Sequence, residues 1–274
     1  MSYLELICSV AAIVVLQLSI ILYAWGFVTA ILRRPDQSSA ASFAFPVLAG
    51  SWLILTTALI TRTLMTAHAP FTNMYEFSLS FGWGVMTCAL LFQWRLKSSV
   101  FGAGGALIAF ALLAYAFTLP SGYTPLPIAL RQSWLLPLHV SCAIMAYGMF
   151  AIGFVSAILY LTHQKYHLSF LPAADLLDRA GYLAVLTGFP LMTLVIVIGS
   201  IWAKVAWGTY WNWDPKETAS LATWLIYAGY LVTRIFLHWN NRRSALLLVI
   251  GFLAVLATFF GNLFLGGLHS YALN

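Results

Sequence analysis

The segment from Trp207 to Glu217 carries the clearest chemical potential in this chain. It reads Trp-Gly-Thr-Tyr-Trp-Asn-Trp-Asp-Pro-Lys-Glu, so three tryptophans, a tyrosine and three charged residues occupy eleven positions of a protein that is only 7% charged. Charges and irregular backbone are not satisfied in hydrocarbon, whereas tryptophan and tyrosine favour the membrane interface. We therefore expect residues 207–217 to lie at a membrane surface. The simpler alternative is an ordinary interfacial belt of aromatic residues.

Two histidines, His139 and His269, flank this segment in the sequence. Neutral imidazole is a common axial ligand of haem iron, two imidazoles fill both axial positions, and flat aromatic side chains cover a macrocycle. If both histidines share the segment's side of the membrane, the pair and the segment could bind haem. Arg131, Lys204 and Lys216 are candidates to pair with the haem carboxylates, Arg131 through bidentate contact. The alternative for either histidine is a solvated or hydrogen-bonded interfacial residue.

The elements that must position these residues are membrane helices. Hydrophobic residues make up 62% of the 274-residue chain, and apolar runs of about 20 residues recur along it. Short connections leave no room for an inserted soluble domain, so we expect an all-α, polytopic helical bundle forming one integral-membrane domain over residues 1–274. The eight predicted spans are Leu4–Leu32, Phe43–Ile60, Phe77–Trp94, Val100–Leu119, Leu138–Thr162, Tyr182–Ala203, Ala219–His238 and Ser244–Phe264.

The distribution of basic residues predicts the orientation. Lysines and arginines concentrate in the connections after the first, third, fifth and seventh spans, which the positive-inside rule places in the cytoplasm. Both termini, His139, His269 and the 207–217 segment between the sixth and seventh spans then face outward. His238 would end the seventh span at the cytoplasmic side, where the alternative is a residue of the inner aromatic belt beside Trp239.

Other features exclude competing functions. The net charge of +6 is spread over short connections, so we expect the lipid bilayer and no nucleic acid as a partner. Cys8, Cys88 and Cys142 lie in apolar runs without a Cys-x-x-Cys pair, so any thiol chemistry must use thiols of a partner. A transporter of another small molecule would need ionisable residues within several spans, and these spans contain almost none.

Two polar stretches have a structural interpretation beside the functional one. Asp214 to Glu217 read as a helix start, with Asp214 as the N-cap, Pro215 at the first helical position and Glu217 completing a capping box. Within Pro70–Glu76, the polar side chains could direct hydrogen bonds toward the same outer cavity, or the stretch could be a turn and an interfacial anchor. The residues concerned are Asn73, Tyr75 and Glu76.

The 207–217 segment resembles the tryptophan-rich "WWD" signature of haem-handling proteins of cytochrome c biogenesis, and its Asp-Pro-Lys-Glu ending resembles the CcsA/ResC family of System II. The Pro70–Glu76 stretch is similar to a Pro-x-x-Asn-x-Tyr-Glu-like stretch before the third of that family's eight spans. The resemblance implies that His139 and His269 are axial ligands of an outer haem b. It also implies that His238 binds haem deeper in the bilayer. The signature residues that would contact haem are Trp207, Tyr210, Trp211, Trp213, Asp214 and Glu217.

The implied activity is that of a cytochrome c haem lyase component, which moves haem outward and holds it for thioether attachment to the Cys-x-x-Cys-His motif of apocytochrome c. A separate CcsB/ResB-type membrane partner is implied, in a bacterial cytoplasmic membrane or a thylakoid, with the signature facing the periplasm, the cell exterior or the lumen. The alternative is a HemX-like haem-binding regulator or chaperone without ligase activity, since those relatives have a similar size.

Overall fold

The computed structural model describes residues 3–32, 39–123 and 134–261, with side chains from residue 43 onward in the second range. It confirms an all-α fold: eight helices are long and apolar enough to cross a membrane, and the described residues contain no strand. The helices are α1 (Tyr3–Ile31), α2 (Ser39–Thr66), α3 (Met74–Leu96), α4 (Ser99–Ala116), α5 (Leu135–Tyr166), α6 (Ala174–Trp207), α7 (Pro215–Phe236) and α8 (Arg242–Phe260). That they form one haem-handling domain stays a prediction.

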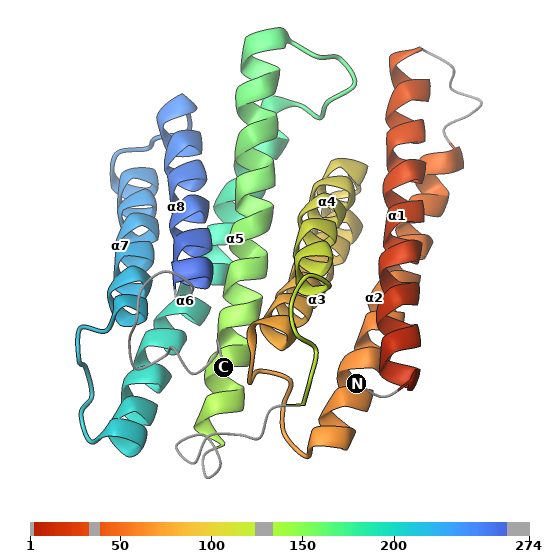
Figure 1. Cartoon of the computed structure of the whole chain (residues 1–274). Coiled ribbons are helices and arrows are strands. Elements are labelled where there is room, and N and C mark those ends of the chain that lie inside the picture. Colours follow the sequence, from red (N-terminus) through yellow and green to blue (C-terminus); the bar gives the residue numbers. More distant parts are fainter. Residues whose placement is uncertain (1–2, 33–38, 124–133, 262–274) are drawn as a thin grey trace.

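The helices run alternately up and down, and α5 lies at the centre (Figure 1). α5 contacts α3, α4, α6 and α8, whereas α1 and α2 pack as a pair at one side, against α4 and α3. α3 and α5 approach closely because Gly148 has no side chain: a Cβ there would lie 2.7 Å from the backbone oxygen of Gly84. Small residues allow this backbone approach in membrane bundles, where water does not drive helices together.

α6 extends at both ends beyond the apolar run that predicts it. α6 begins at Ala174 and ends at Trp207, whereas its apolar run covers only residues 182–203. Gly208 follows with φ +81°, the left-handed conformation that commonly ends a helix, and its N–H donates to the backbone oxygen of Lys204. Trp207 is therefore the last residue of a helix, and only residues 208–214 connect α6 to α7.

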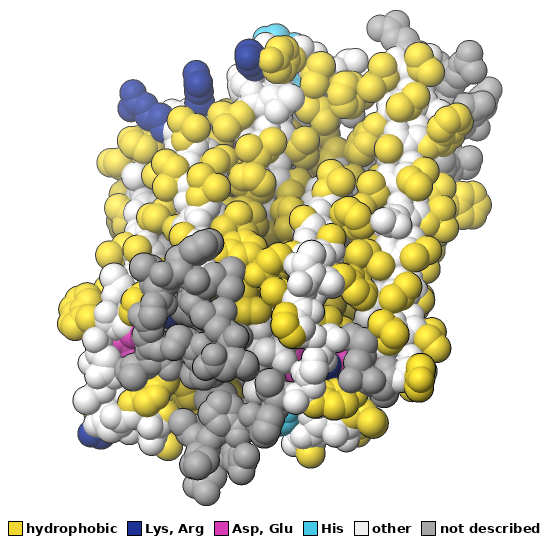
Figure 2. Space-filling view, viewed as in Figure 1, with side chains coloured by type: hydrophobic (Ala, Val, Ile, Leu, Met, Phe, Trp, Pro, Cys, Tyr) yellow, Lys and Arg dark blue, Asp and Glu magenta, His cyan; other side chains and the backbone are white. Residues whose placement is uncertain are grey.

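The two ends of the bundle differ in composition. The end that holds residues 207–217, here called the tryptophan end, also contains the beginning of α1, at the bottom of Figure 1. The opposite end, here called the basic end, carries the lysines and arginines seen at the top of Figure 2. Its described basic residues are Arg95, Lys97, Lys165, Arg179, Arg234, Arg242 and Arg243. Arg33 and Arg34 lie outside the described residues.

A buried ion cluster joins α1, α2 and α3 at the tryptophan end. The Arg62 side chain donates to Glu5 and to Glu76, in both cases at 2.7 Å, and all three residues are at most 1% exposed. Arg62 also donates to the backbone oxygens of Ser121 and Gly122, both at 3.0 Å. Every buried charge thus has close partners, as burial in a membrane protein requires.

This cluster decides between the two interpretations of the Pro70–Glu76 stretch. Asn73 is the N-cap of α3, with its side chain accepting from the backbone N–H of Glu76, and the Tyr75 ring lies 5.1 Å from the Arg62 guanidinium. Glu76 accepts from Arg62 and from the backbone N–H of Thr72. The side chains of Asn73, Tyr75 and Glu76 therefore stabilise the turn before α3 and anchor it to α1 and α2, as the structural interpretation predicts.

Candidate functional site

His139 is the best-oriented histidine at the tryptophan end. It lies in the second turn of α5, half-buried, and its Nδ1 is 2.9 Å from the backbone oxygen of Val195 on α6. A carbonyl oxygen can only accept, so this bond requires the proton on Nδ1. In the neutral ring Nε2 then carries the lone pair that can bind a metal, and a hydrogen bond at the other nitrogen is the usual way to orient a ligating imidazole.

The absence of a side chain at Gly199 leaves the space that the His139 imidazole occupies. A Cβ at this position would lie 2.8 Å from Cε1 and 3.0 Å from Nδ1 of His139, closer than side chains pack. Val195, Gly199 and Trp202 follow one another at spacings of four and three residues, so they occupy one face of α6. That face supplies the carbonyl acceptor, the space for the ring and an aromatic wall.

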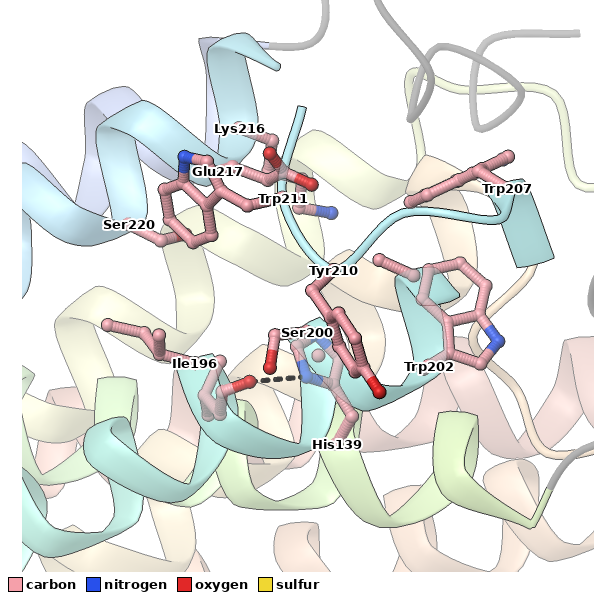
Figure 3. A pocket seen from close by; sticks show the side chains of 13 residues that line it. His139, Ile196, Ser200, Trp202, Trp207, Tyr210, Trp211, Lys216, Glu217 and Ser220 are labelled. Atoms are coloured by element: carbon pink, nitrogen blue, oxygen red, sulfur yellow. Dashed lines mark hydrogen bonds between the residues drawn. The ribbon is translucent and has the colours of Figure 1, made fainter. Parts of the chain in front are cut away.

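His139 lies at the boundary of two adjoining hollows. The first has about 460 Å³ of unfilled space, part of it open to solvent, and is walled by Trp202, Trp207, Tyr210 and Trp211. In Figure 3, Trp202 and Trp207 lie on one side of His139, and Trp211 with Ser220 lies on the other. Trp202 is 2% exposed and meets Trp207 edge to face at 4.8 Å.

The second hollow lies deeper among α3, α5, α6, α7 and α8, with about 660 Å³ of unfilled space, part of it open to solvent. It shares His139, Val195, Lys216 and Ser220 with the first hollow, so the two are continuous around these residues. Apart from Thr258, its other lining residues are apolar or aromatic: Met74, Phe77, Phe81, Val140, Ala143, Ile144, Tyr147 and Phe259. The combined space is apolar and aromatic, with few polar groups, which is typical of a ligand site.

The 208–214 connection is fixed by the cap of α7, as the sequence predicts. The Asp214 side chain accepts from the backbone N–H of Lys216 at 3.0 Å, and Pro215 is the first helical residue. Glu217 completes the capping box and also accepts from the backbone N–H of Asn212 at 2.8 Å. The carboxylate of Glu217 therefore fixes the backbone on either side of Trp213 and next to Trp211.

Two lysines near the hollows differ in what they can bind. The Lys204 ammonium donates to the backbone oxygen of Gly208 at 2.7 Å and thereby caps α6. Lys216 lines both hollows, with its ammonium 5.2 Å from the centre of the Phe77 ring. Lys216 is thus the described cation placed to meet an anionic group of a ligand in this space.

Trp211 supplies a second polar group. Its indole Nε1 is buried, and no described residue offers it an acceptor. A buried donor without a partner costs free energy, so such groups often serve a ligand or water. An apolar hollow that contains an oriented imidazole, a cation and this donor fits a flat, apolar macrocycle with a central metal and carboxylates.

Other predicted residues lie elsewhere. Trp213 is 69% exposed with φ +56°; its ring is 5.8 Å from that of Trp211, and it lines neither hollow. His238 follows the end of α7 at the basic end, exposed and with φ +51°. Arg131 and His269 lie outside the described residues. The described part of the site therefore supplies one imidazole, and roles for these four residues stay predictions.

Sequence reasoning missed Trp202, Gly199 and the carbonyl of Val195. All three fall within one apolar run, where neither composition nor motif distinguishes them. The available signal was their helical spacing upstream of Trp207, which places a small residue between two larger ones on a single face. That signal has meaning only once α6 is known to continue to Trp207.

Comparisons with known proteins agree with this architecture. Residues 71–269 match the model of a family described as "Cytochrome C assembly protein". The cytochrome c biogenesis protein CcsA of Guillardia theta is 35% identical over 247 residues, which cover 80% of this chain and 82% of the relative. CcsA of Synechococcus sp. (strain CC9605) is 32% identical over 286 residues, covering 90% and 94%.

The fold also resembles a solved structure, that of the cytochrome c haem lyase CcmF. The TM-score is 0.61 with 15% sequence identity, over 93% of this chain and 49% of the other, so this chain spans about half of that protein. Such low identity supports a common fold alone. The family match and the CcsA relatives show more: this chain is an integral membrane protein of the CcsA family, with a role in cytochrome c maturation.

Proposed function

We propose that this protein holds haem at the tryptophan end for thioether attachment to apocytochrome c. The observation that carries the proposal is the His139 imidazole, held through Nδ1 by the Val195 carbonyl at the boundary of a hollow with tryptophan walls. An iron in a macrocycle already has four nitrogen ligands and needs only axial ones, so a single oriented imidazole is a sufficient contribution from α5.

Each described side chain then has a task toward the substrate. His139 binds the iron, the rings of Trp202, Trp207 and Trp211 cover the macrocycle, and Lys216 pairs with a carboxylate. Glu217 keeps the 208–214 connection in place. In this proposal His269 is the second axial ligand, Arg131 is a further carboxylate partner, and Trp213 is an exposed aromatic surface at the rim.

The attachment itself requires little chemistry from this chain. The thiol of a Cys-x-x-Cys-His segment adds across a haem vinyl group: a carbon–sulfur bond forms, and the thiol proton ends on the other vinyl carbon. Haem supplies the vinyl group and apocytochrome c supplies the thiol, so this protein acts by holding the two in register. A CcsB/ResB-type membrane partner completes the complex.

The orientation follows from charge. With the basic end in the cytoplasm, the tryptophan end faces the periplasm, the cell exterior or the thylakoid lumen, where apocytochrome c receives haem. His238, at the basic end, is then a candidate ligand for haem on its way outward, and Trp239 beside it fits the inner aromatic belt.

The test is to purify the full chain alone and with its membrane partner, record the haem spectrum, and assay attachment to a Cys-x-x-Cys-His substrate. His139→Ala should lose the six-coordinate haem spectrum, and added imidazole should partly restore it. His68→Ala is the matched control, because His68 lies at the same end, bonds the backbone oxygen of Ala69 and lines neither hollow. Absence of haem in both preparations would refute the proposal. Haem binding without attachment would favour a HemX-like regulator.

A further inference from the structure

A second hollow region lies at the basic end, far from the candidate haem site. A groove with about 1370 Å³ of open space lies there between the end of α5 and the start of α8. The groove is lined by Tyr160, Leu161, Gln164, Lys165, Asn241, Arg242 and Leu246. None of these seven residues is acidic, and none is a histidine, cysteine or methionine. The groove therefore offers positive charge and hydrogen-bond donors.

The local charge balance strengthens this character. Among the described residues of the basic end, the only acids are Asp175 and Asp178, and Asp178 is paired with Arg234. Arg243, next to the groove, lies over the Trp239 ring at 5.6 Å. Lys165, at the rim, lies over the Tyr166 ring at 4.8 Å, a contact that a flexible lysine can exchange for an anion.

Both helices place the cation above an apolar strip. On α8, Arg242 is followed on the same face by the exposed side chains of Leu246, Ile250 and Leu253, at spacings of four, four and three residues. On α5, Leu161 and the exposed Ile158 lie on the same face as Lys165, four and seven residues before it and nearer the membrane centre. Each wall of the groove thus has a charged top and an apolar track below it.

We propose that this groove binds an anionic phospholipid, with the headgroup phosphate on Lys165 and Arg242 and the acyl chains along the two strips. Basic pockets between membrane helices at the cytoplasmic side are suited to anionic headgroups. Two separate apolar strips match the two acyl chains of a phospholipid better than they match the single rigid plane of a haem. The groove suits an anionic headgroup better than haem, because its lining has neither an imidazole nor a thioether, and the Tyr160 hydroxyl donates to the backbone oxygen of Asn240.

The experiment is native mass spectrometry of the purified full chain, titrated with phosphatidylglycerol or phosphatidylcholine bearing identical acyl chains. Wild type should bind phosphatidylglycerol more tightly. Each cation near the surface contributes about 1 kcal/mol, so Lys165→Gln with Arg242→Gln should weaken phosphatidylglycerol binding about 25-fold and leave phosphatidylcholine unchanged. Arg95→Gln with Lys97→Gln is the control, since it removes the same charge from the same end, at the end of α3 and outside the groove. Thermal unfolding should match wild type in both double variants.

Several outcomes would overturn the proposal. Equal binding of the two lipids would do so, as would equal loss in the two double variants. Competition by soluble glycerol phosphate at the same concentration as the lipid would assign the groove to a free phosphate. Displacement of the lipid by haem in wild type, absent from the Lys165 and Arg242 double variant, would assign it to the haem carboxylates. These results are independent of whether His139 binds haem.

Discussion

Gly199→Ala tests the candidate haem site without touching a proposed ligand. The new Cβ would lie 2.8 Å from Cε1 and 3.0 Å from Nδ1 of His139, whereas carbon contacts are optimal at about 3.5–4.0 Å. The imidazole must therefore move by roughly 0.5–1 Å, because the α6 backbone beneath it cannot. That movement exceeds the tolerance of a ligand geometry, which is about 0.5 Å.

The expected loss of haem affinity follows from the hydrogen bond that the displaced His139 ring loses. Its Nδ1 moves away from the Val195 oxygen, now 2.9 Å distant, and this kind of orienting bond is worth about 10–100-fold in metal affinity. We expect haem to bind Gly199→Ala about 10–100-fold more weakly than wild type. Optical titration of the purified protein with haem measures this directly.

The control is Gly229→Ala on α7, because nothing lies within 4 Å of a Cβ at that position. Both substitutions replace a helical glycine by alanine, and alanine by itself favours the helix by about 1 kcal/mol over glycine. Added imidazole should restore His139→Ala better than Gly199→Ala, since the displaced native ring still occupies the space in the latter. Equal haem affinity for Gly199→Ala and Gly229→Ala would refute the claim that Gly199 positions the ligand.

Two further predictions concern the supports of the site. Arg62→Met should lower the free energy of unfolding by about 3–5 kcal/mol, because Glu5 and Glu76 would remain buried without their cation. Thermal unfolding in detergent measures the loss, and adding Glu5→Gln and Glu76→Gln should recover most of it; no recovery would argue against a charge effect. Glu217→Ala should cost about 0.5–2 kcal/mol through loss of the capping box, whereas Glu217→Gln, whose amide oxygen can still accept, should cost less. Equal melting temperatures for these two variants would contradict that role.

The sequence predicted those parts of the structure that depend on local chemistry. Eight apolar runs indicated eight helices, since the length of a span is set by the bilayer. The Asp214–Glu217 stretch indicated the start of α7, because a capping box is complete within four residues. The predicted topology made His139 a candidate, because it placed this histidine on the side of the membrane that carries residues 207–217.

The parts that escaped prediction depend on residues far apart in the sequence. Glu5 and Arg62 meet only after α1 and α2 have paired, so a buried ion cluster cannot be predicted from their separate positions along the chain. The acceptor of His139 is a backbone oxygen, and any residue type carries one. Gly199 could be recognised only from the tertiary contact that a side chain there would prevent.

The candidate haem site is formed more by helices than by the 208–214 connection, which carries most of the tryptophan-rich signature. His139 comes from α5, and Val195, Gly199, Trp202 and Trp207 come from α6, so the ligand, its acceptor and much of the aromatic wall belong to two helices in close contact. The connection adds Tyr210 and Trp211, and the cap of α7 fixes it through Glu217. Ligand geometry is held more tightly by packed helices than by a loop. The continuation of α6 to Trp207 therefore gives the candidate haem site a rigid frame at this end of the bundle.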